Sequence, residues 1–254
     1  ACLYGIGSRP RMNALLQTRG LTAFYGDAQA LFGIDFQVDQ GEMVAIIGAN
    51  GAGKSTFMKA VTGLLAVQPA QILWQGQPIG GMSASEIAKR GIALVPEGRR
   101  LFSSLNVEEN LLMGECAERK GVWNLLRVYE LFPILKQKRL QASTSLSGGQ
   151  QQMVAIGRAL MSNPALLLCD ELSLGLAPIV IKEIYSAMPR ICAEGMTVVM
   201  VEQDVSKARE VSSRLYCFQE GSVSLQGVSS TLTAEQISQA YFGMPDKPAG
   251  AGAV

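Results

Sequence analysis

An α/β fold with a largely parallel central sheet is predicted by continuous apolar runs and by the patterns around them. The segments MVAII (43–47), ALLLC (165–169) and TVVMV (197–201) consist of apolar or β-branched residues, which is typical of strands buried on both faces of a parallel sheet. Around the first of them, IDFQV (34–38) and ILWQGQPI (72–79) alternate apolar and polar residues and indicate half-exposed antiparallel strands. Together these runs predict a mixed sheet.

The stretch between residues 106 and 142 has a different period. Apolar side chains recur there at steps of three and four residues, and β-branched runs are mostly absent, as expected for helices. We therefore expect a helical subdomain at about residues 98–163, inserted between the first two continuous apolar runs.

Neither end of the chain shows such a pattern. Residues 1–11 have no period and begin without methionine, so we expect an unstructured N-terminal extension and a natural start at Met12. Residues 244–254 are rich in Pro, Gly and Ala and predict a flexible tail. The domain is expected to span residues 12–243.

Composition excludes several classes of protein. With 254 residues, 48% apolar content and a mean hydropathy of +0.20, the chain can bury a sizeable core. A net charge of +1 gives no broad electrostatic footprint for nucleic acid. The five cysteines are scattered and never paired as CxxC, which argues against a disulfide framework, against a zinc site and for a reducing compartment. No apolar run approaches the roughly 18–20 residues of a membrane span.

The segment GANGAGKST (48–56) follows the first buried strand and precedes an apolar helical stretch. The pattern GxxxxGK[ST] in this context indicates a phosphate loop, in which backbone N–H groups from Asn50 to Lys54 curl around phosphate oxygens at a helix N-terminus. Lys54 then reaches the β and γ phosphates, and Ser55 can ligate Mg²⁺. An ordinary glycine-rich turn is the alternative.

The run ALLLC ends on two carboxylates, Asp170 and Glu171. At the carboxyl edge of a parallel sheet such groups project toward a ligand crevice. We expect Asp170 to hold Mg²⁺ through water, and Glu171 to orient and deprotonate an attacking water. The alternative is that one of them caps the next helix.

The pentapeptide LSGGQ (146–150) lies between the phosphate loop and the acidic pair, just after the predicted helical insert. With these three motifs in this order, the chain resembles the ATP-binding cassette (ABC) ATPases. In that family two domains face each other head to tail. Ser147 and the amides of Gly148 and Gly149, which form an anion-binding helix start, would then close over the γ phosphate held by Lys54 of the other domain. A flexible Ser/Gly turn is the alternative.

The resemblance covers about residues 15–243 and implies an ABC nucleotide-binding domain. Its parts would be a RecA-like mixed sheet, an N-terminal antiparallel β subdomain and a helical insert carrying LSGGQ, with ATP and Mg²⁺ as cofactors. Tyr25 lies where the family stacks an aromatic ring on adenine. Glu97 stands in place of the glutamine in the family's loop that touches Mg²⁺ and the membrane partner, and SLGLAP (173–178) lies in the loop that crosses to the opposite site. The alternatives are a plain strand aromatic and ordinary surface loops.

Gln203, just after TVVMV, matches the switch histidine of the family, and the chain contains no histidine. A glutamine amide can donate a hydrogen bond to phosphate, but it cannot gain a proton near neutral pH. We therefore expect Glu171 to carry the base role alone. A strand-end polar residue that faces water is the alternative.

The Glu97 and Gln203 departures, with segments such as FYGDAQAL and LSLGLAP, resemble the ATPase subunits of branched-chain amino acid importers. That resemblance implies a peripheral subunit on the cytoplasmic face of the bacterial inner membrane. Its partners would be two transmembrane permeases, a second ABC ATPase subunit and, indirectly, a periplasmic solute-binding protein, with no nucleic acid. The alternatives are the ATPase of a urea, short-amide or other ABC importer, and a non-transport ABC ATPase. Leu172 departs from the subgroup, in which proline follows the acidic pair, and leaves the rigidity of the crossing loop open.

The predicted site has three parts. The catalytic residues are Lys54, Glu171 and Gln203, and the metal ligands are Ser55, Glu97 and Asp170. The nucleotide-binding residues are Tyr25, Gly48, Ala49, Asn50, Gly51, Ala52, Gly53, Lys54, Ser55, Thr56, Ser147, Gly148, Gly149 and Gln150.

Overall fold

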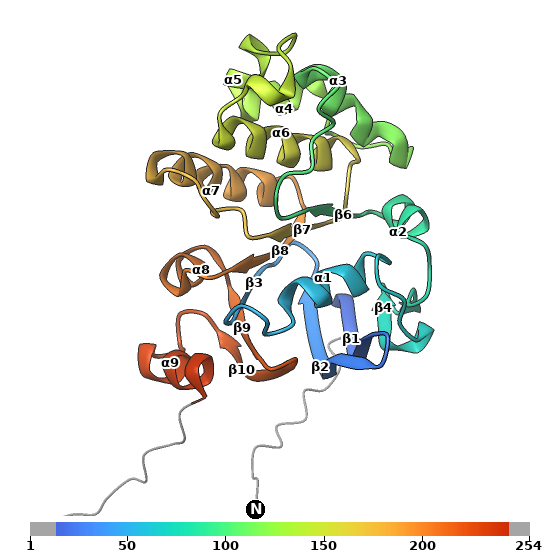
Figure 1. Cartoon of the computed structure of the whole chain (residues 1–254), viewed down its shortest axis with the longest axis vertical. Helices are drawn as coiled ribbons and strands as arrows, with labels where there is room; N and C mark the ends of the chain where they lie inside the picture. The colour runs from blue at the N-terminus through green and yellow to red at the C-terminus, as the bar shows by residue number, and fades with distance from the viewer. Residues whose placement is uncertain (1–13, 244–254) are drawn as a thin grey trace, which may run out of the picture.

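The computed structural model describes residues 14–243, which form two sheets with helices around them (Figure 1). The predicted extension at 1–11, its boundary at Met12 and the predicted tail at 244–254 lie outside the described residues. Within them, the first sheet is antiparallel and has the order β2-β1-β4-β5. Its strands are β1 (Ala14–Tyr25), β2 (Ala28–Asp39), β4 (Ile72–Trp74) and β5 (Gln77–Pro78).

The second sheet has six strands among the described residues, in the order β10-β9-β3-β8-β7-β6. All its pairings are parallel except that of β9 with β10, so this sheet is itself mixed. Its strands are β3 (Met43–Ile47), β6 (Ile92–Val95), β7 (Leu166–Asp170), β8 (Thr197–Glu202), β9 (Arg214–Gln219) and β10 (Ser222–Val228). The run MVAII thus belongs to this sheet, and not with the antiparallel strands that flank it in the sequence, because its partners β8 and β9 come from the far end of the chain.

Strand β3 is buried on both faces, which explains its continuous apolar run. Val44 and Ile46 pack into a core shared with the antiparallel sheet, whereas Ala45 and Ile47 pack into a second core under the helices. Burial of this kind contributes about 25 cal/mol per Å² of apolar surface. The loop that follows β3 therefore starts from a rigid base.

The helices fall into two groups. Around the sheets lie α1 (Lys54–Val61), α2 (Ala84–Arg90), α7 (Pro178–Ala193), α8 (Val205–Val211) and α9 (Ala234–Phe242). Between β6 and β7 the chain forms a separate helical layer at one end of the molecule (Figure 1). It consists of α3 (Val107–Leu112), α4 (Leu125–Leu131), α5 (Pro133–Gln137) and α6 (Gly148–Met161), with short 3₁₀ helices at Met113–Ala117 and Ser143–Ser145. A further short 3₁₀ helix, Pro69–Gln71, precedes β4.

The helical layer is built from short pieces with defined ends. Helix α3 begins at a capping box formed by Asn106 and Glu109, and α6 begins at a capping box formed by Ser147 and Gln150. Such boxes satisfy N–H groups that the first helical turn leaves without partners. The LSGGQ motif thus starts α6, the longest helix of this layer.

None of the helices in the described part of the chain is long and apolar enough to cross a membrane. The cysteines in that part, Cys116, Cys169, Cys192 and Cys217, are all free thiols.

Candidate functional site

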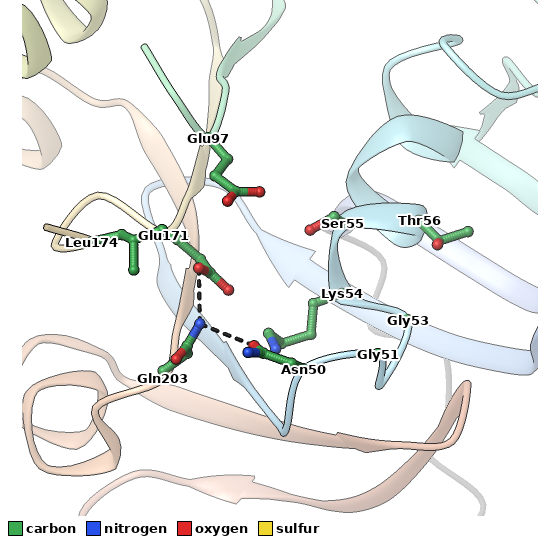
Figure 2. Close-up of a pocket in the computed structure, with 10 residues that line it drawn as sticks. All are labelled: Asn50, Gly51, Gly53, Lys54, Ser55, Thr56, Glu97, Glu171, Leu174 and Gln203. Atoms are coloured by element: carbon green, nitrogen blue, oxygen red, sulfur yellow. Dashed lines mark hydrogen bonds between the residues drawn. The ribbon is translucent and has the colours of Figure 1, made fainter.

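A polar cavity of about 410 Å³ lies at the carboxyl edge of the six-stranded sheet, where the segments after β3, β6, β7 and β8 meet (Figure 2). The structure brings together here most of the residues predicted from the phosphate loop, the acidic pair and the switch position. The lining consists of Asn50, Gly51, Gly53, Lys54, Ser55, Thr56, Glu97, Glu171, Leu174 and Gln203.

The phosphate loop needs its glycines for close backbone approach and for backbone conformation. Gly48 has φ +152°, and a Cβ there would lie 2.3 Å from the carbonyl oxygen of Phe218. Gly53 has φ +97° and lies against Leu31, so a Cβ would be strained and crowded. These two positions bring the chain from β3 directly into α1.

Lys54 lies at the centre of this loop. The residue is only 4% exposed, and its Nζ donates hydrogen bonds to the carbonyl oxygens of Gly48 at 2.7 Å and Ala49 at 2.9 Å. Burial lowers the pKa of Lys54, whereas the negative charges of Glu171 and Asp170 oppose that shift. The loop therefore presents a desolvated ammonium group beside two carboxylates.

Asp170 ends β7 and is buried. Ser55 Oγ lies 3.5 Å from its Oδ1, which brings the first turn of α1 to the acidic pair. Burial raises the pKa of Asp170, and the negative charges of Glu171 and Glu97 add to that rise. A carboxylate in these surroundings favours a nearby cation.

Glu171 has a left-handed backbone with φ 49°, which costs a residue with a side chain roughly 1–2 kcal/mol. Its N–H donates to the carbonyl oxygen of Val201 at 3.1 Å. Gln203 Nε2 donates to Glu171 Oε2 at 2.9 Å and to Asn50 Oδ1 at 3.1 Å (Figure 2). The amide of Gln203 therefore joins the acidic pair to the phosphate loop.

Some predicted residues lie elsewhere. Ser147, Gly148, Gly149 and Gln150 start α6 and do not line this cavity. Tyr25 ends β1, is half exposed and lies beside α1, where Lys59 Nζ is 5.7 Å from its ring centroid. Gly48, Ala49 and Ala52 belong to the loop without lining the cavity, and Asp170 is reached through Ser55.

A second, more apolar cavity of about 950 Å³ adjoins the first. Ser55 and Glu97 line both of them. The loop after Glu97 is tied to α6 because Arg158 donates to the carbonyl oxygens of Arg99 and Arg100, and its guanidinium lies 5.4 Å from the centre of the Phe102 ring. The walls of this cavity include Tyr25, Met58, Leu64, Ile87, Arg100, Phe102, Met113, Cys116 and Arg158.

Two features were missed by reasoning from the sequence. Leu174 lines the first cavity although its motif predicts only a loop. Glu202 is buried at the end of β8 next to Gln203; an acidic residue directly after a continuous apolar run was the available signal. Leu172, which stands in place of proline, is 1% exposed and packs into the core under the helices.

Comparisons with known proteins identify the family. A family model described as ABC transporter matches residues 31–173. The high-affinity branched-chain amino acid transport ATP-binding protein BraG of Pseudomonas aeruginosa is 43% identical over 226 residues, which cover 88% of this chain and 97% of BraG. A probable branched-chain amino acid transport ATP-binding protein, LivF of Archaeoglobus fulgidus, is 30% identical over 86% of this chain and 94% of LivF. The solved structure of a nucleotide-free ATP-binding cassette from an ABC transporter superposes with a TM-score of 0.77 at 26% identity, covering 91% of this chain and 96% of the other. The chain therefore belongs to the ABC transporter family, as an ATP-binding and ATP-hydrolysing domain.

Proposed function

We propose that this chain powers the import of branched-chain amino acids through a membrane ABC transporter. The observation that carries the proposal is the 43% identity to BraG over 88% of the chain. Glu97 and Gln203 support it, because both differ from the general ABC pattern and resemble the branched-chain subgroup at these positions. As such a subunit, the chain would lie peripherally on the cytoplasmic face of the bacterial inner membrane.

In this proposal the phosphate loop, residues 48–56, holds the triphosphate of ATP. Its backbone N–H groups from Asn50 onward and the N-terminal end of α1 supply donors and partial positive charge. Lys54 contributes a full charge, and its burial strengthens each electrostatic contact that it makes. Tyr25, at the edge of β1 beside α1, stacks on the adenine ring.

Mg²⁺ fits the donors beside the loop. Ser55 and Asp170 offer a hydroxyl and a carboxylate 3.5 Å apart, and Glu97 lines the same cavity; Mg²⁺ prefers oxygen ligands of this kind. The raised pKa of Asp170 marks a site where a cation relieves unfavourable charge. Among the described residues no group of three or more His, Cys, Asp or Glu side chains could hold a metal by itself, so phosphate oxygens and water would complete the shell. An ion held by these residues would neutralise charge on the phosphates.

Glu171 is the general base of the proposed reaction. Its carboxylate lies at the cavity, and the hydrogen bond from Gln203 Nε2 fixes the direction of one oxygen (Figure 2). From this position Glu171 orients a water molecule toward the γ phosphate and accepts its proton, a role worth typically 10²- to 10⁴-fold in rate. Gln203 orients the carboxylate and senses the γ phosphate, but it does not exchange a proton.

The second half of the site comes from another ABC ATPase subunit. Ser147, Gly148, Gly149 and Gln150 do not line the cavity of their own chain. Facing a second cassette head to tail, the start of α6 would close over the γ phosphate bound by Lys54 of that cassette. Specific activity should then rise with protein concentration, or on mixing with a different cassette subunit.

The part of the second cavity lined by Arg100, Phe102 and Met113 suits a transmembrane permease, whereas Tyr25 and Ser55, which also line this cavity, serve the nucleotide. Its walls combine apolar side chains such as Met113 and Phe102 with Arg100, and it adjoins the proposed Mg²⁺ site through Glu97. A permease segment seated there would contact the loop that also faces the nucleotide. This arrangement links solute transport to hydrolysis.

An uptake experiment tests the proposal. Cells that lack their own branched-chain ATPase subunits should regain uptake of labelled leucine when this chain is produced with two permeases and a solute-binding protein of that system. The Glu171→Gln variant should not restore uptake. Restored uptake of urea or short amides, but not of leucine, would favour the alternative importer. ATP turnover that no permease changes would favour a non-transport ABC ATPase.

A further inference from the structure

A third carboxylate, Glu202, lies beside the acidic pair and has no part in the mechanism above. Glu202 is the last residue of β8 and is 1% exposed. It follows Val201, which pairs with Asp170 across the sheet. Burial raises the pKa of Glu202. Because a buried ionisable group costs free energy unless it is hydrogen-bonded, the partners of Glu202 indicate its purpose.

Both oxygens of Glu202 accept hydrogen bonds from hydroxyl groups that follow Glu171 in the chain. Ser173 Oγ donates to Oε2 at 2.8 Å, and the Tyr185 hydroxyl on α7 donates to Oε1. The backbone carbonyl of Ser173 also accepts from the N–H of Leu176 at 3.2 Å. The carboxylate therefore ties the first turn after the acidic pair to both β8 and α7.

The residues on either side of Glu202 hold the other end of the same loop. Val201 accepts the backbone N–H of Glu171 at 3.1 Å, and Gln203 Nε2 donates to the Glu171 carboxylate at 2.9 Å. Glu171 also has the left-handed φ of 49°, which persists only where the surroundings hold it. The direction of its carboxylate thus depends on how firmly the loop is anchored.

We propose that Glu202 is a positioning residue for ATP hydrolysis. Through Ser173 and Tyr185 it fixes the loop of residues 171–177, and through that loop it holds the Glu171 carboxylate toward the cavity. The inference rests on the proposed base role of Glu171. It adds the hydrogen bonds that hold the left-handed backbone of Glu171 in place.

Single-atom changes test the proposal in the full chain. Ser173→Ala and Tyr185→Phe each remove one hydroxyl and leave the phosphate loop untouched. We expect kcat to fall about tenfold, the effect of one lost hydrogen bond to a charged group, while ATP affinity stays within about twofold. Ser173→Thr, which keeps the hydroxyl, should restore kcat. Ser186→Ala, an exposed neighbour of Tyr185 that bonds only within α7, is the matched control and should resemble the parent.

A double variant shows whether Ser173 acts through Glu171. In the Glu171→Gln background, Ser173→Ala should lower the residual rate no further, because the group that it positions is already gone. Equal losses of kcat and ATP affinity, additive losses in the double variant, or a Ser173→Ala kcat within twofold of the parent would each overturn the inference. Near-normal turnover by Glu171→Gln alone would instead overturn the proposed function.

Discussion

The chain contains two glycine-rich helix starts, and they use glycine for different physical reasons. In the phosphate loop, Gly48 and Gly53 have positive φ values and the backbone passes close to neighbouring elements. At the start of α6, the glycines give space to side chains: a Cβ on Gly148 would lie 3.0 Å from the Arg99 guanidinium, and one on Gly149 would lie 2.2 Å from Val180. The phosphate loop therefore needs glycine for backbone conformation as well as for close approach, whereas the start of α6 needs it for packing alone.

The two starts also differ in what surrounds them. Lys54 and both carboxylates of the acidic pair lie at the phosphate loop. At the start of α6, Ser147 and Gln150 instead bind each other. The Ser147 N–H donates to the Gln150 side chain, and the Gln150 N–H donates to the Ser147 hydroxyl. One region therefore combines a lysine with two carboxylates, whereas the other consists of a capped helix start beside the Arg99 guanidinium. In the proposed head-to-tail pair, a single chain would therefore supply the phosphate loop and acidic pair to one site and the start of α6 to the other.

The largest effect is expected from a variant that removes only the proposed catalytic base. Glu171→Gln keeps the loop, Lys54 and Asp170, so ATP affinity should persist while turnover falls by about 10²- to 10⁴-fold. Equilibrium ATP binding and single-turnover hydrolysis measure the two quantities. Glu183→Gln, an exposed carboxylate on α7, is the control and should leave both unchanged. Turnover close to that of the parent would refute the base role.

The next-largest effect distinguishes the phosphate loop from the start of α6 by their contributions to ATP affinity. Lys54→Ala should weaken ATP affinity by about 10- to 100-fold, the effect of lost charge-assisted hydrogen bonds. Ser147→Ala should leave the ATP affinity of the monomer within about twofold and lower hydrolysis only where two cassettes meet. It also removes a helix cap worth about 1 kcal/mol. Thr233→Ala removes a similar capping box on α9 and controls for that loss. Equal losses of ATP affinity by Lys54→Ala and Ser147→Ala would contradict the division into two halves.

A smaller effect is expected at Gln203, whose amide joins the phosphate loop to the acidic pair. Gln203→Ala loses hydrogen bonds worth about 0.5–3 kcal/mol and should lower turnover with little effect on ATP affinity. Gln203→His should add a pH-dependent limb near pH 6.5 that comes from the imidazole, a group that the parent lacks because it contains no histidine. Since phosphate also titrates near pH 6, the informative quantity is the difference between the variant and the parent. Superimposed profiles would mean that position 203 does not sense the phosphate.

Much of this architecture was predictable because local sequence encodes it. The buried runs of β3, β7 and β8 place Lys54, Asp170 and Gln203 at one sheet edge, and the family resemblance implies the same grouping. Pairing at long range was harder to foresee: β3 joins β8 and β9 from the far end of the chain, so MVAII does not share a sheet with its sequence neighbours. The role of Glu202 was also hidden, because its partners Ser173 and Tyr185 come from other elements.

The smallest expected effect concerns folding rather than turnover, and it compares two aspartates near the site. Asp170 is buried with a raised pKa, so without nucleotide and metal its ionisation opposes folding. For Asp204, burial also raises the pKa, but the hydrogen bonds and charge of Lys207 outweigh it and leave the pKa lowered. Asp170→Asn should therefore stabilise the chain, by about 2–4 °C in Tm for each kcal/mol of relief. Asp204→Asn should destabilise it slightly, because the pair is partly exposed.

The pH dependence of these two effects has opposite sign. For Asp170, the unfolded chain loses its proton first, near pH 3.9, so the penalty begins there and is complete above the higher folded pKa. The advantage of Asp170→Asn should thus grow as pH rises through that window. For Asp204, the favourable contribution is complete above pH 3.9 or so and disappears as pH falls through the lower folded pKa. Unfolding free energies of the parent and both variants, measured in chelator from about pH 2.5 to 8, check both trends, since the Asp204 effect changes only at the acid end of this range. A stabilising effect of Asp170→Asn that does not change with pH would show that the carboxylate is not the cause, and with it the electrostatic argument for a cation at this position would fail.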